Sequence, residues 1–352
     1  MTDTQEKIRR LVSVDLIVLI LFCMGVKRLM DAPRNNYILV AGGCGFLGSN
    51  FVRNVAQNHS DIQIVVLDSL TYAGSASNLP YSFPNVDLMV GDICDPQTVD
   101  GLVLFADAVV NFAAETHNDN SINEPTPFLY TNVEGTFNLI EACRKYDIRY
   151  HHVSTDEVFG DLSIQGLEQF NESSPYRPSS PYSATKAASD LLVKAWVRTY
   201  GLRATISNSS NCYGPYQYTE KFIPNVITSV LRGVKPKLYG NGRNVREWMY
   251  AEDHSSAIWK ILTEGHIGES YTISSSNSRS NIEVLQLILK LMGKSEEYFE
   301  RVADRPGHDR RYSLDSSKLR QELGWEPRHT DFVAGLQQTI DWYRENEAWW
   351  RD

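Results

Sequence analysis

The stretch VSTDEVFGDL, residues 153–162, places a hydroxyl and two carboxylates side by side directly after an apolar run. These three residues are Thr155, Asp156 and Glu157. An isolated triplet of this kind is typical of a solvated loop. At the end of a buried strand, however, one carboxyl group could donate a proton to a bound molecule while the other removes one.

A tyrosine and a lysine lie four residues apart in PYSATK, at Tyr182 and Lys186. On a helix this spacing points both side chains the same way. The lysine ammonium would favour the phenolate and draw the pKa of the phenol down from about 10. Such a tyrosine could take a proton from a substrate hydroxyl. The same spacing also occurs on exposed helix faces, so the pair needs a supporting context.

That context is a glycine-rich turn near the start of the chain. The predicted strand YILVA (37–41) runs into GGCGFLGSN, which gives Gly42-x-x-Gly45-x-x-Gly48 and a helix from Phe46. Glycines here permit a tight turn and let the backbone approach a pyrophosphate that faces the helix N-terminus. Strand, turn and helix in this order predict a dinucleotide site. A dinucleotide bound there could accept a hydride from the substrate while Tyr182 takes a proton from its hydroxyl.

Asp68 ends the second predicted strand, twenty residues past Gly48. A carboxylate at this place accepts hydrogen bonds from an adenosine ribose and repels a 2′-phosphate, which favours NAD over NADP. Asp92, after the run LMVG, could lie against the adenine or could be an ordinary aspartate at a strand end.

Short β-branched runs alternate with helical stretches from Asn36 onward. This alternation predicts an α/β protein with a Rossmann-type doubly wound parallel sheet covered on both faces. A smaller C-terminal α/β substrate lobe is expected after about Ser209, where turns interrupt shorter helices. The last stretch, RHTDFVAGLQQTIDWYRENEAWW, is expected to be one closing helix capped by Asp331. The predicted strands are 37–41, 62–67, 87–90, 108–112, 149–153 and 203–208, and the predicted long helices are 126–146 and 182–201.

Three parts of the chain are expected. Residues 1–35 form an N-terminal extension, 36–208 the NAD-binding Rossmann domain with the catalytic residues, and 209–352 mainly the nucleotide-sugar lobe, with some segments returning to the Rossmann domain. The apolar run of the extension, Leu16 to Val26, is eleven residues long, whereas a membrane-spanning helix needs about 20. The extension could pack on the protein or a partner, have no function, or associate weakly with a membrane.

Composition argues against several other functions. The chain has 352 residues and a formal net charge of −9, which argues against nucleic acid as a partner, because phosphate binding needs a basic face. Its five cysteines are scattered, with no Cys-x-x-Cys pair, so neither a metal site nor a disulfide framework is expected. Cysteine usage of this kind fits the reducing cytoplasm.

From about Asn36 onward the chain resembles the extended short-chain dehydrogenases/reductases, and within them the dTDP-glucose 4,6-dehydratases. The motifs that carry the resemblance are GGCGFLGSNFV, LDSLTYAG, GDICD, FAAETHNDNSI, TNVEGTFNLIEA, STDEVFGDL, PYSATKAASD, NCYGPYQYTEKFIPNVI, REWMYAEDH and DRPGHDRRY. STDEVFGDL is the most specific, because related 4-epimerases carry small residues where Asp156 and Glu157 stand. The resemblance implies tightly bound NAD, a nucleotide-sugar substrate (dTDP-glucose) and a homodimer formed through two long helices of each subunit.

The resemblance also implies a role for each catalytic residue. The sugar would be oxidised at C4, lose water across C5 and C6, and receive the hydride back at C6. Tyr182 would be the C4 base, and Thr155 would hydrogen-bond the sugar near O4. Glu157 would remove the C5 proton, and Asp156 would protonate the departing C6 hydroxyl.

Two carboxyl groups with different tasks need different environments. Asp156 must stay protonated at neutral pH, which requires an apolar or anionic setting that raises its pKa. Glu157 must be ionised when C5 is deprotonated. Because neighbouring residues of a strand point to opposite sides, the chain is expected to bend after Val153 so that both groups reach one sugar.

Two shells of binding residues follow from the same resemblance. The NAD shell comprises Gly42, Gly45, Phe46, Leu47, Gly48, Asp68, Ser69, Leu70, Thr71, Asp92, Ile93, Phe112, Ala113, Ala114, Glu115, Thr131, Tyr182, Lys186 and Cys212. The substrate shell comprises Thr116, Thr155, Asn211, Lys221, Phe222, Lys237, Leu238, Tyr239, Arg246, Asn281, Asp304, Arg305, Pro306, Gly307 and His308.

Some positions depart from the family pattern, and some alternatives stay open. Ala41, Cys44, Asn120 and Cys212 replace the usual residues, and such changes could alter NAD affinity or dimer contacts. The alternatives are a UDP-sugar 4,6-dehydratase, a nucleotide-sugar 4-epimerase and a catalytically silent NAD-binding interaction protein. The adjacent carboxylates after Thr155 argue against the epimerase.

Overall fold

Seven parallel strands form the central sheet, in the order β10-β6-β5-β4-β1-β2-β3. The computed structural model describes residues 36–80, 82–304 and 307–351. The parallel arrangement confirms the predicted Rossmann-type sheet, and all carboxyl ends of the strands meet at one edge. The strands are β1 (Tyr37–Ala41), β2 (Gln63–Asp68), β3 (Val86–Val90), β4 (Ala108–Asn111), β5 (Arg149–Thr155), β6 (Ala204–Ser209) and β10 (Ser270–Ile273).

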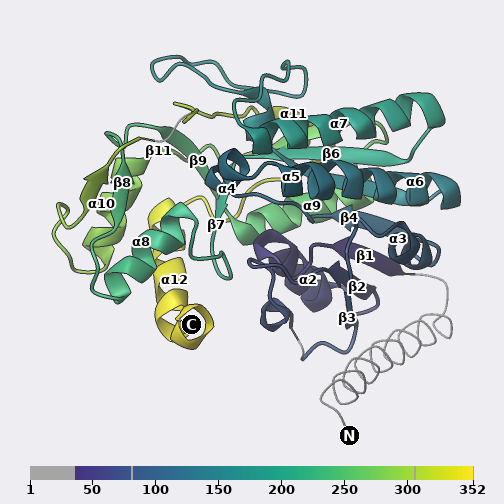
Figure 1. Ribbon diagram of the computed structural model, residues 1–352, viewed down its shortest axis with the longest axis horizontal. Helices are drawn as coiled ribbons and strands as arrows, with labels where there is room; N and C mark the ends of the chain where they lie inside the picture. Colours follow the sequence, from purple (N-terminus) through teal and green to yellow (C-terminus); the bar gives the residue numbers. More distant parts are fainter. Residues whose placement is uncertain (1–35, 81, 305–306, 352) are drawn as a thin grey trace, which may run out of the picture.

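Helices cover both faces of this sheet (Figure 1). Both faces of the central strands are therefore buried, which explains why they read as nearly continuous apolar runs. One apolar core lies under α2 (Phe46–Asn58), α9 (Ala251–Glu264) and α11 (Ser317–Leu323). The opposite core lies under α3 (Pro96–Val103), α6 (Thr136–Tyr146) and α7 (Pro181–Tyr200).

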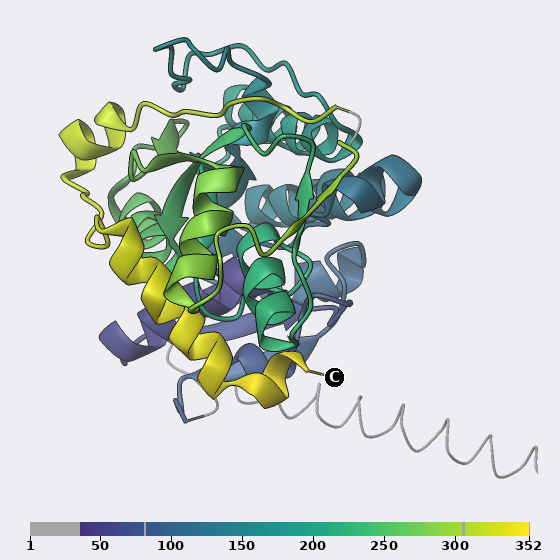
Figure 2. The ribbon, with the colours of Figure 1, turned by 90° about the vertical axis from the view of Figure 1, so that its left-hand side faces the viewer.

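A smaller lobe with its own apolar core lies beside the sheet, and Figure 2 shows this lobe facing the viewer. The helices α8, α10 and α12 pack against one another in it. Its elements are β7 (Asn211–Tyr213), α8 (Phe222–Leu231), β8 (Lys237–Tyr239), β9 (Val245–Tyr250), β11 (Ser278–Ser280), α10 (Asn281–Leu291), β12 (Glu300–Val302) and α12 (Phe332–Glu345).

Two predicted helices are each divided in the structure. The helix expected at 126–146 consists of α5 (Thr126–Phe128), the π-helical segment η2 (Leu129–Gly135) and α6. The closing helix starts at the predicted cap, since Asp331 accepts hydrogen bonds from the N–H groups of Val333 and Ala334. It ends at Asn346, where the backbone leaves the helical region (φ −111°, ψ 40°) and a short α13 (Glu347–Trp350) follows.

Three short helical turns complete the described elements: η1 (Ala76–Asn78), α4 (Asn118–Asn123) and η3 (Asp156–Phe159). None of the helices in the described ranges has the length and apolar character needed to cross a membrane. The predictions made for the N-terminal extension, residues 1–35, fall outside the described residues.

Candidate active site

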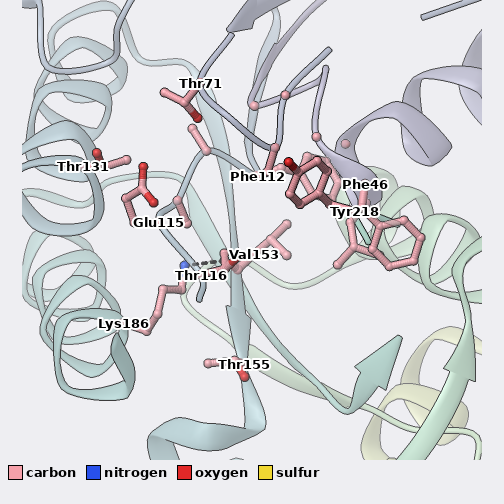
Figure 3. Close-up of a pocket in the computed structure, with 18 of the residues that line it drawn as sticks. Phe46, Thr71, Phe112, Glu115, Thr116, Thr131, Val153, Thr155, Lys186 and Tyr218 are labelled. Atoms are coloured by element: carbon pink, nitrogen blue, oxygen red, sulfur yellow. Dashed lines mark hydrogen bonds between the residues drawn. The ribbon is translucent and has the colours of Figure 1, made fainter. Parts of the chain in front are cut away.

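One cleft at the carboxyl edge of the sheet brings together most of the residues singled out in the sequence (Figure 3). Its volume is about 340 Å³, within the usual range of small-molecule sites. Every predicted member of the NAD shell lines this cleft except Leu70. Leu70 instead packs its side chain against an apolar core, while its N–H donates to Asp68 Oδ1 at 2.9 Å.

The glycine-rich turn leaves no room for side chains at two positions. Gly42 has a positive φ of 75°, and a Cβ built there would lie 2.4 Å from the backbone nitrogen of Ala113. A Cβ at Gly48 would lie 2.1 Å from the carbonyl oxygen of Gly42. This tight turn at the start of α2 presents backbone to the cleft, and the residues present therefore fit a dinucleotide pyrophosphate.

Asp68 lies at the end of β2 on the floor of the same cleft. Its carboxylate accepts hydrogen bonds from the N–H groups of Cys44, at 2.8 Å, and Leu70, at 2.9 Å. Burial raises the pKa of Asp68, and these two hydrogen bonds offset part of that effect. The carboxylate therefore ties the glycine turn to the second strand, and its role at an adenosine ribose stays a prediction.

The triplet predicted to be catalytic, residues 155–157, forms the junction between β5 and the turn η3. The strand continues to Thr155, so the bend comes two residues later than expected. The Thr155 hydroxyl accepts a hydrogen bond from the N–H of Glu157 at 3.2 Å and caps the turn. Gly160 closes it with a φ of 87°, and a Cβ there would lie 2.3 Å from the carbonyl oxygen of Arg177. The tight turn lets both Asp156 and Glu157 line the cleft.

Asp156 is the more deeply buried of the two carboxyl groups, with 1% of its surface exposed. Burial raises its pKa well above the usual value, and the negative charges of Glu157 and Glu247 act in the same direction against an opposing effect of Arg246. Its Oδ1 accepts a hydrogen bond from the Thr155 hydroxyl at 3.2 Å, whereas its Oδ2 has no described hydrogen-bond partner. This setting is the apolar and anionic one expected for a carboxyl group that stays protonated.

Glu157 has a different environment. Its Oε2 accepts a hydrogen bond from the side-chain amide of Asn118 at 3.0 Å. Asn118, at the start of α4, is a contact that the sequence reasoning missed, although it lies inside the motif FAAETHNDNSI. A donor to one oxygen fixes the carboxylate while leaving its other oxygen for a substrate proton.

Tyr182 and Lys186 lie one turn apart on α7, and both line the cleft. Burial raises the pKa of the Tyr182 phenol, with a further increase from Glu157, which is the opposite of the direction expected from the sequence. The Lys186 ammonium donates to the carbonyl oxygen of Val153 at 2.8 Å, as Figure 3 shows. Burial lowers the pKa of Lys186 to about 8.

The predicted substrate shell is divided. Only four of its members line the cleft, namely Thr116, Thr155, Asn211 and Lys221. Lys221 reaches across from the small lobe and donates to the carbonyl oxygen of Thr116 at 2.9 Å. Six other members lie on elements of the small lobe outside the cleft: Phe222, Lys237, Leu238, Tyr239, Arg246 and Asn281. Asp304, Gly307 and His308 do not line the cleft either, and a Cβ at Gly307 would lie 3.3 Å from the carbonyl oxygen of Ser179. Arg305 and Pro306 lie outside the described residues.

Arg246 illustrates the second group. Its guanidinium lies 4.3 Å from the centre of the Tyr312 ring and donates to the carbonyl oxygen of Asp309 at 2.9 Å. It is nonetheless close enough to Asp156 to lower the pKa of that carboxyl group. The guanidinium thus contacts Asp309 and Tyr312 while its charge acts on Asp156 in η3.

Several lining residues were missed by the sequence reasoning. They are Leu67, Ala73, Gly74, Gly91, Val153, Ser154, Ser209, Ser210, Gln217, Tyr218 and Glu220. Most lie within one or two residues of a predicted position, and the carboxyl ends of parallel strands could have identified them. Tyr218 and Glu220 come from the small lobe, and no local pattern signals that this loop folds over the cofactor end.

Two departures from the family pattern lie close to this cleft. Cys212 lines it, and its thiol donates weakly to the carbonyl oxygen of Ser210 at 3.5 Å. Asn120 lies in α4, where its N–H donates to the His117 ring at 3.4 Å. Neither residue touches the hydroxyl, carboxylates or phenol of the catalytic group through a described hydrogen bond.

Comparison with known proteins gives a consistent result. A family model described as GDP-mannose 4,6 dehydratase matches residues 39–339. A protein named dTDP-glucose 4,6-dehydratase from Mycolicibacterium smegmatis is 57% identical over 314 residues, covering 89% of this chain and 95% of that protein. Another of the same name, from Escherichia coli, is 45% identical, covering 89% of this chain and 94% of that protein.

Solved structures show the same relationship. A dTDP-glucose 4,6-dehydratase from Streptomyces venezuelae, crystallised with NAD bound, has a TM-score of 0.86 at 44% identity and covers 89% of this chain and 98% of its own. A UDP-glucose 4-epimerase from Thermotoga maritima reaches a TM-score of 0.82 at only 26% identity, covering 88% and 99% of the two chains. The fold is thus shared with epimerases, whereas sequence identity separates them. The resemblance found in the motifs is confirmed: the chain belongs to the family of nucleotide-sugar 4,6-dehydratases.

Proposed function

We propose that the chain catalyses the NAD-dependent dehydration of dTDP-glucose to dTDP-4-keto-6-deoxyglucose. The observation that carries the proposal is the convergence of Asp156, Glu157, Tyr182 and Lys186 on one cleft. The two carboxyl groups have different environments there. Asp156 is buried near other negative charges, whereas Glu157 accepts a hydrogen bond from Asn118. An epimerase has no use for such a pair, because it removes no water.

The cofactor shell assigned above would hold NAD along the glycine turn, with Asp68 at the ribose. Bound NAD supplies a hydride acceptor that is restored in each turnover, so the reaction has no net redox change. Val153, Ala113 and Phe112 contribute apolar surface to this end of the cleft. We propose the division of labour that the sequence predicts, with cofactor and catalytic groups in residues 36–208 and nucleotide-sugar contacts mainly in residues 209–352.

The side chains of this protein then move three protons. Tyr182 accepts the proton of the C4 hydroxyl, and Thr155 orients that hydroxyl. The Lys186 ammonium, one helical turn away, supplies a positive charge that opposes the effect of burial on the phenol. Glu157 removes the C5 proton once a C4 ketone acidifies it. Asp156 gives its proton to the C6 hydroxyl, which leaves as water. A raised pKa suits Asp156 to this last step, because a protonated carboxyl group is available at neutral pH.

Two parallel incubations test the function. The purified protein is supplied with NAD and either dTDP-glucose or UDP-glucose, and the alkaline chromophore of the 4-keto product is measured. We expect turnover of dTDP-glucose, little or none of UDP-glucose, and loss of turnover in Tyr182→Phe. With dTDP-glucose deuterated at C4, the label is expected in the C6 methyl group. Equal turnover of UDP-glucose would contradict the proposed nucleotide, and absence of label from the methyl group would contradict the mechanism.

We also propose that two copies of the chain associate through the outer face of η2, α6 and α7. Apolar side chains are exposed there, including Leu129 at 56%, Tyr130 at 57% and Leu191 at 57%. A monomer has no reason to keep such a patch in water, and helix pairs are suited to symmetric packing. Leu129→Glu should reduce the solution mass to that of one chain, whereas Leu167→Glu, on a side chain 96% exposed outside the patch, should not. A monomeric wild type would contradict this assignment.

The compartment is the remaining part of the proposal. The four cysteines among the described residues are free thiols. Free thiols fit a reducing environment, so we propose the cytoplasm.

A further inference from the structure

Asp190 is a buried carboxylate that none of the proton transfers above uses. It lies on α7 one helical turn beyond Lys186, and none of its surface is exposed. Its Oδ2 accepts hydrogen bonds from the hydroxyl of Tyr176, at 3.0 Å, and the side-chain amide of Asn208, at 3.1 Å. A carboxylate in a protein interior is costly unless it has a partner charge or donors. Asp190 has two hydrogen-bond donors, Tyr176 and Asn208, and an opposite charge on Lys186 one helical turn away.

His152 faces the other oxygen of this carboxylate. Its Nε2 lies 3.4 Å from Asp190 Oδ1, a separation that allows attraction without a short hydrogen bond. Its Nδ1 lies 3.1 Å from the hydroxyl of Tyr150. Burial and the charge of Lys186 lower the pKa of His152, so the imidazole is neutral at neutral pH. The neutral imidazole is therefore a polar neighbour of the Asp190 carboxylate and does not neutralise its charge.

The charge of Asp190 is retained despite its burial. Burial alone would raise its pKa, but the combined effects of His152 and Lys186 outweigh it and leave the pKa lowered. Asp190 and Lys186 thus carry opposite charges, four residues apart on one buried face of α7. Other ionisable groups also interact with these two charges. Lys194 donates to the Tyr176 hydroxyl at 2.8 Å and is affected by the charge of Asp190. The charge of Asp190 also acts on Tyr182 of the same helix, and that of Lys186 acts on His152 of β5.

We propose that Asp190 is a positioning residue for the reaction: it keeps charged the Lys186 ammonium, which donates to the carbonyl oxygen of Val153 one helical turn from Tyr182. The inference rests on the proposed function, because it assigns a consequence to Lys186 in that reaction. Its physical basis is that a buried lysine readily loses its proton, whereas a fixed anion one turn away favours the charged form. In the absence of the anion, Lys186 would be neutral over more of the working pH range and would no longer favour the phenolate.

The experiment compares two variants of the same cluster, one that removes the charge of Asp190 and one that keeps it. Asp190→Asn removes the charge and keeps the size. Tyr176→Phe removes one donor to Asp190 Oδ2 and keeps the charge. The rate of dTDP-glucose turnover is measured from pH 6 to pH 10 for both variants and the wild type. In parallel, the Cε resonance of Lys186, identified by its loss in Lys186→Arg, reports the protonation of the amine by NMR.

Loss of the charge should move the high-pH limb of the rate profile and the Lys186 titration together. We expect both to move to lower pH by about one pH unit in Asp190→Asn, the smaller end of the range for loss of a nearby opposite charge. Neither should move in Tyr176→Phe, even if both variants lose some rate. Unmoved curves in Asp190→Asn, or equal displacements in both variants, would overturn the proposal and leave Asp190 a structural residue.

Two further observations keep the outcome unambiguous. If Asp190→Asn does not fold, the Asp190 carboxyl carbon of the wild type is followed by NMR, and it is expected to stay ionised from pH 6 to pH 9. A protonated Asp190 in that interval would overturn the proposal. A wild type that binds NAD but does not turn over dTDP-glucose would contradict the proposed function, whereas the NMR titration of Lys186 would still test the pairing.

Discussion

The two ends of the cleft are built on different principles. At the cofactor end the shape comes from backbone, because Gly42 and Gly48 allow chain segments to approach where any Cβ would collide. At the catalytic end the chemistry comes from buried side chains, with Asp156 at 1% exposure and Lys186 at 4%. The cofactor end therefore depends on positions that have no side chain, and the catalytic end depends on ionisable side chains that are buried away from water.

This difference explains how each end tolerates change. A backbone cradle is insensitive to small changes of charge but sensitive to one added methyl group. A buried ionisable group is sensitive to charge even when the volume is conserved, because the interior screens charges poorly. Variants that conserve volume should therefore affect the catalytic end, and variants that conserve charge should affect the cofactor end.

The largest effect is expected at Glu157. Glu157→Gln keeps the shape and the contact with Asn118 but removes the base, so exchange of the C5 proton with solvent should fall by about 10²–10⁴-fold. NAD binding should be unchanged, because Glu157 lies at the sugar end of the cleft. The measurement is deuterium incorporation from heavy water at C5. Glu220→Gln, which changes another acid of the same cleft, is the control, and similar losses in both variants would show that Glu157 has no special role.

At the cofactor end, added side-chain volume should reduce NAD binding even when no charge changes. Gly48→Ala introduces a methyl group 2.1 Å from the carbonyl oxygen of Gly42, so the turn must shift. We expect NAD affinity to fall by about 100-fold, on the order of the 1–3 kcal/mol that overpacking costs. Calorimetric titration with NAD measures it.

Gly101→Ala is the matched control for this change. Gly101 lies in α3 with nothing within 4 Å of its added Cβ. This substitution should leave NAD affinity unchanged and raise the free energy of unfolding by up to about 1 kcal/mol, because alanine is the better helix former. A full-affinity Gly48→Ala protein would show that the turn does not hold the pyrophosphate.

The same comparison indicates what the sequence alone could predict. At the cofactor end, the glycine turn between a strand and a helix and Asp68 at the next strand end gave a local signal, and the family resemblance supplied the rest of the NAD shell, all of which lines the cleft except Leu70. Tyr182 and Lys186 were also found, since a four-residue spacing fixes a shared helix face. The parallel sheet followed from the alternation of strands and helices.

The environments of the catalytic groups could not be predicted in this way. The approach of His152 to Asp190 depends on how β5 packs against α7, and the contact of Asn118 with Glu157 joins residues 39 apart in sequence. The preference of Lys186 for the carbonyl oxygen of Val153 depends on a single tertiary distance. Local spacing fixes which face a side chain occupies, but a pKa depends on everything packed around it.

Burial of Asp156 should make stability depend on pH in a specific direction. Its pKa in the folded state is raised, so the stability contributed by the protonated form is complete below the unfolded pKa of about 4 and is lost as pH rises through the folded pKa. Asp156→Asn stays neutral at every pH. It should match the wild type near pH 4 and exceed it at pH 8 by about 1–3 kcal/mol, the usual cost of an unsatisfied buried polar group.

Denaturant unfolding across this pH range measures the effect. Asp61→Asn, at an exposed position, is the control, and its curve should run parallel to that of the wild type. An Asp156→Asn protein that gains no stability at pH 8 would show that the carboxyl group is not held neutral by its surroundings. Turnover should be lost in either case, because the amide cannot donate the proton that Asp156 provides.

The smallest effect tests whether side chains also support the backbone cradle. The indole N–H of Trp349 in α13 donates to Asn78 Oδ1 at 2.7 Å, and the Asn78 amide donates to the carbonyl oxygen of Cys44 in the glycine turn at 2.8 Å. Trp349→Phe keeps an aromatic ring but removes this donor, so NAD affinity should fall about 2- to 10-fold, the equivalent of one hydrogen bond. Trp342→Phe changes a ring of the same aromatic cluster, 5.1 Å from that of Trp349, and should leave the affinity unchanged. Equal losses in both variants would attribute the effect to packing of the cluster, and no loss in either would show that the turn is held by its own backbone alone.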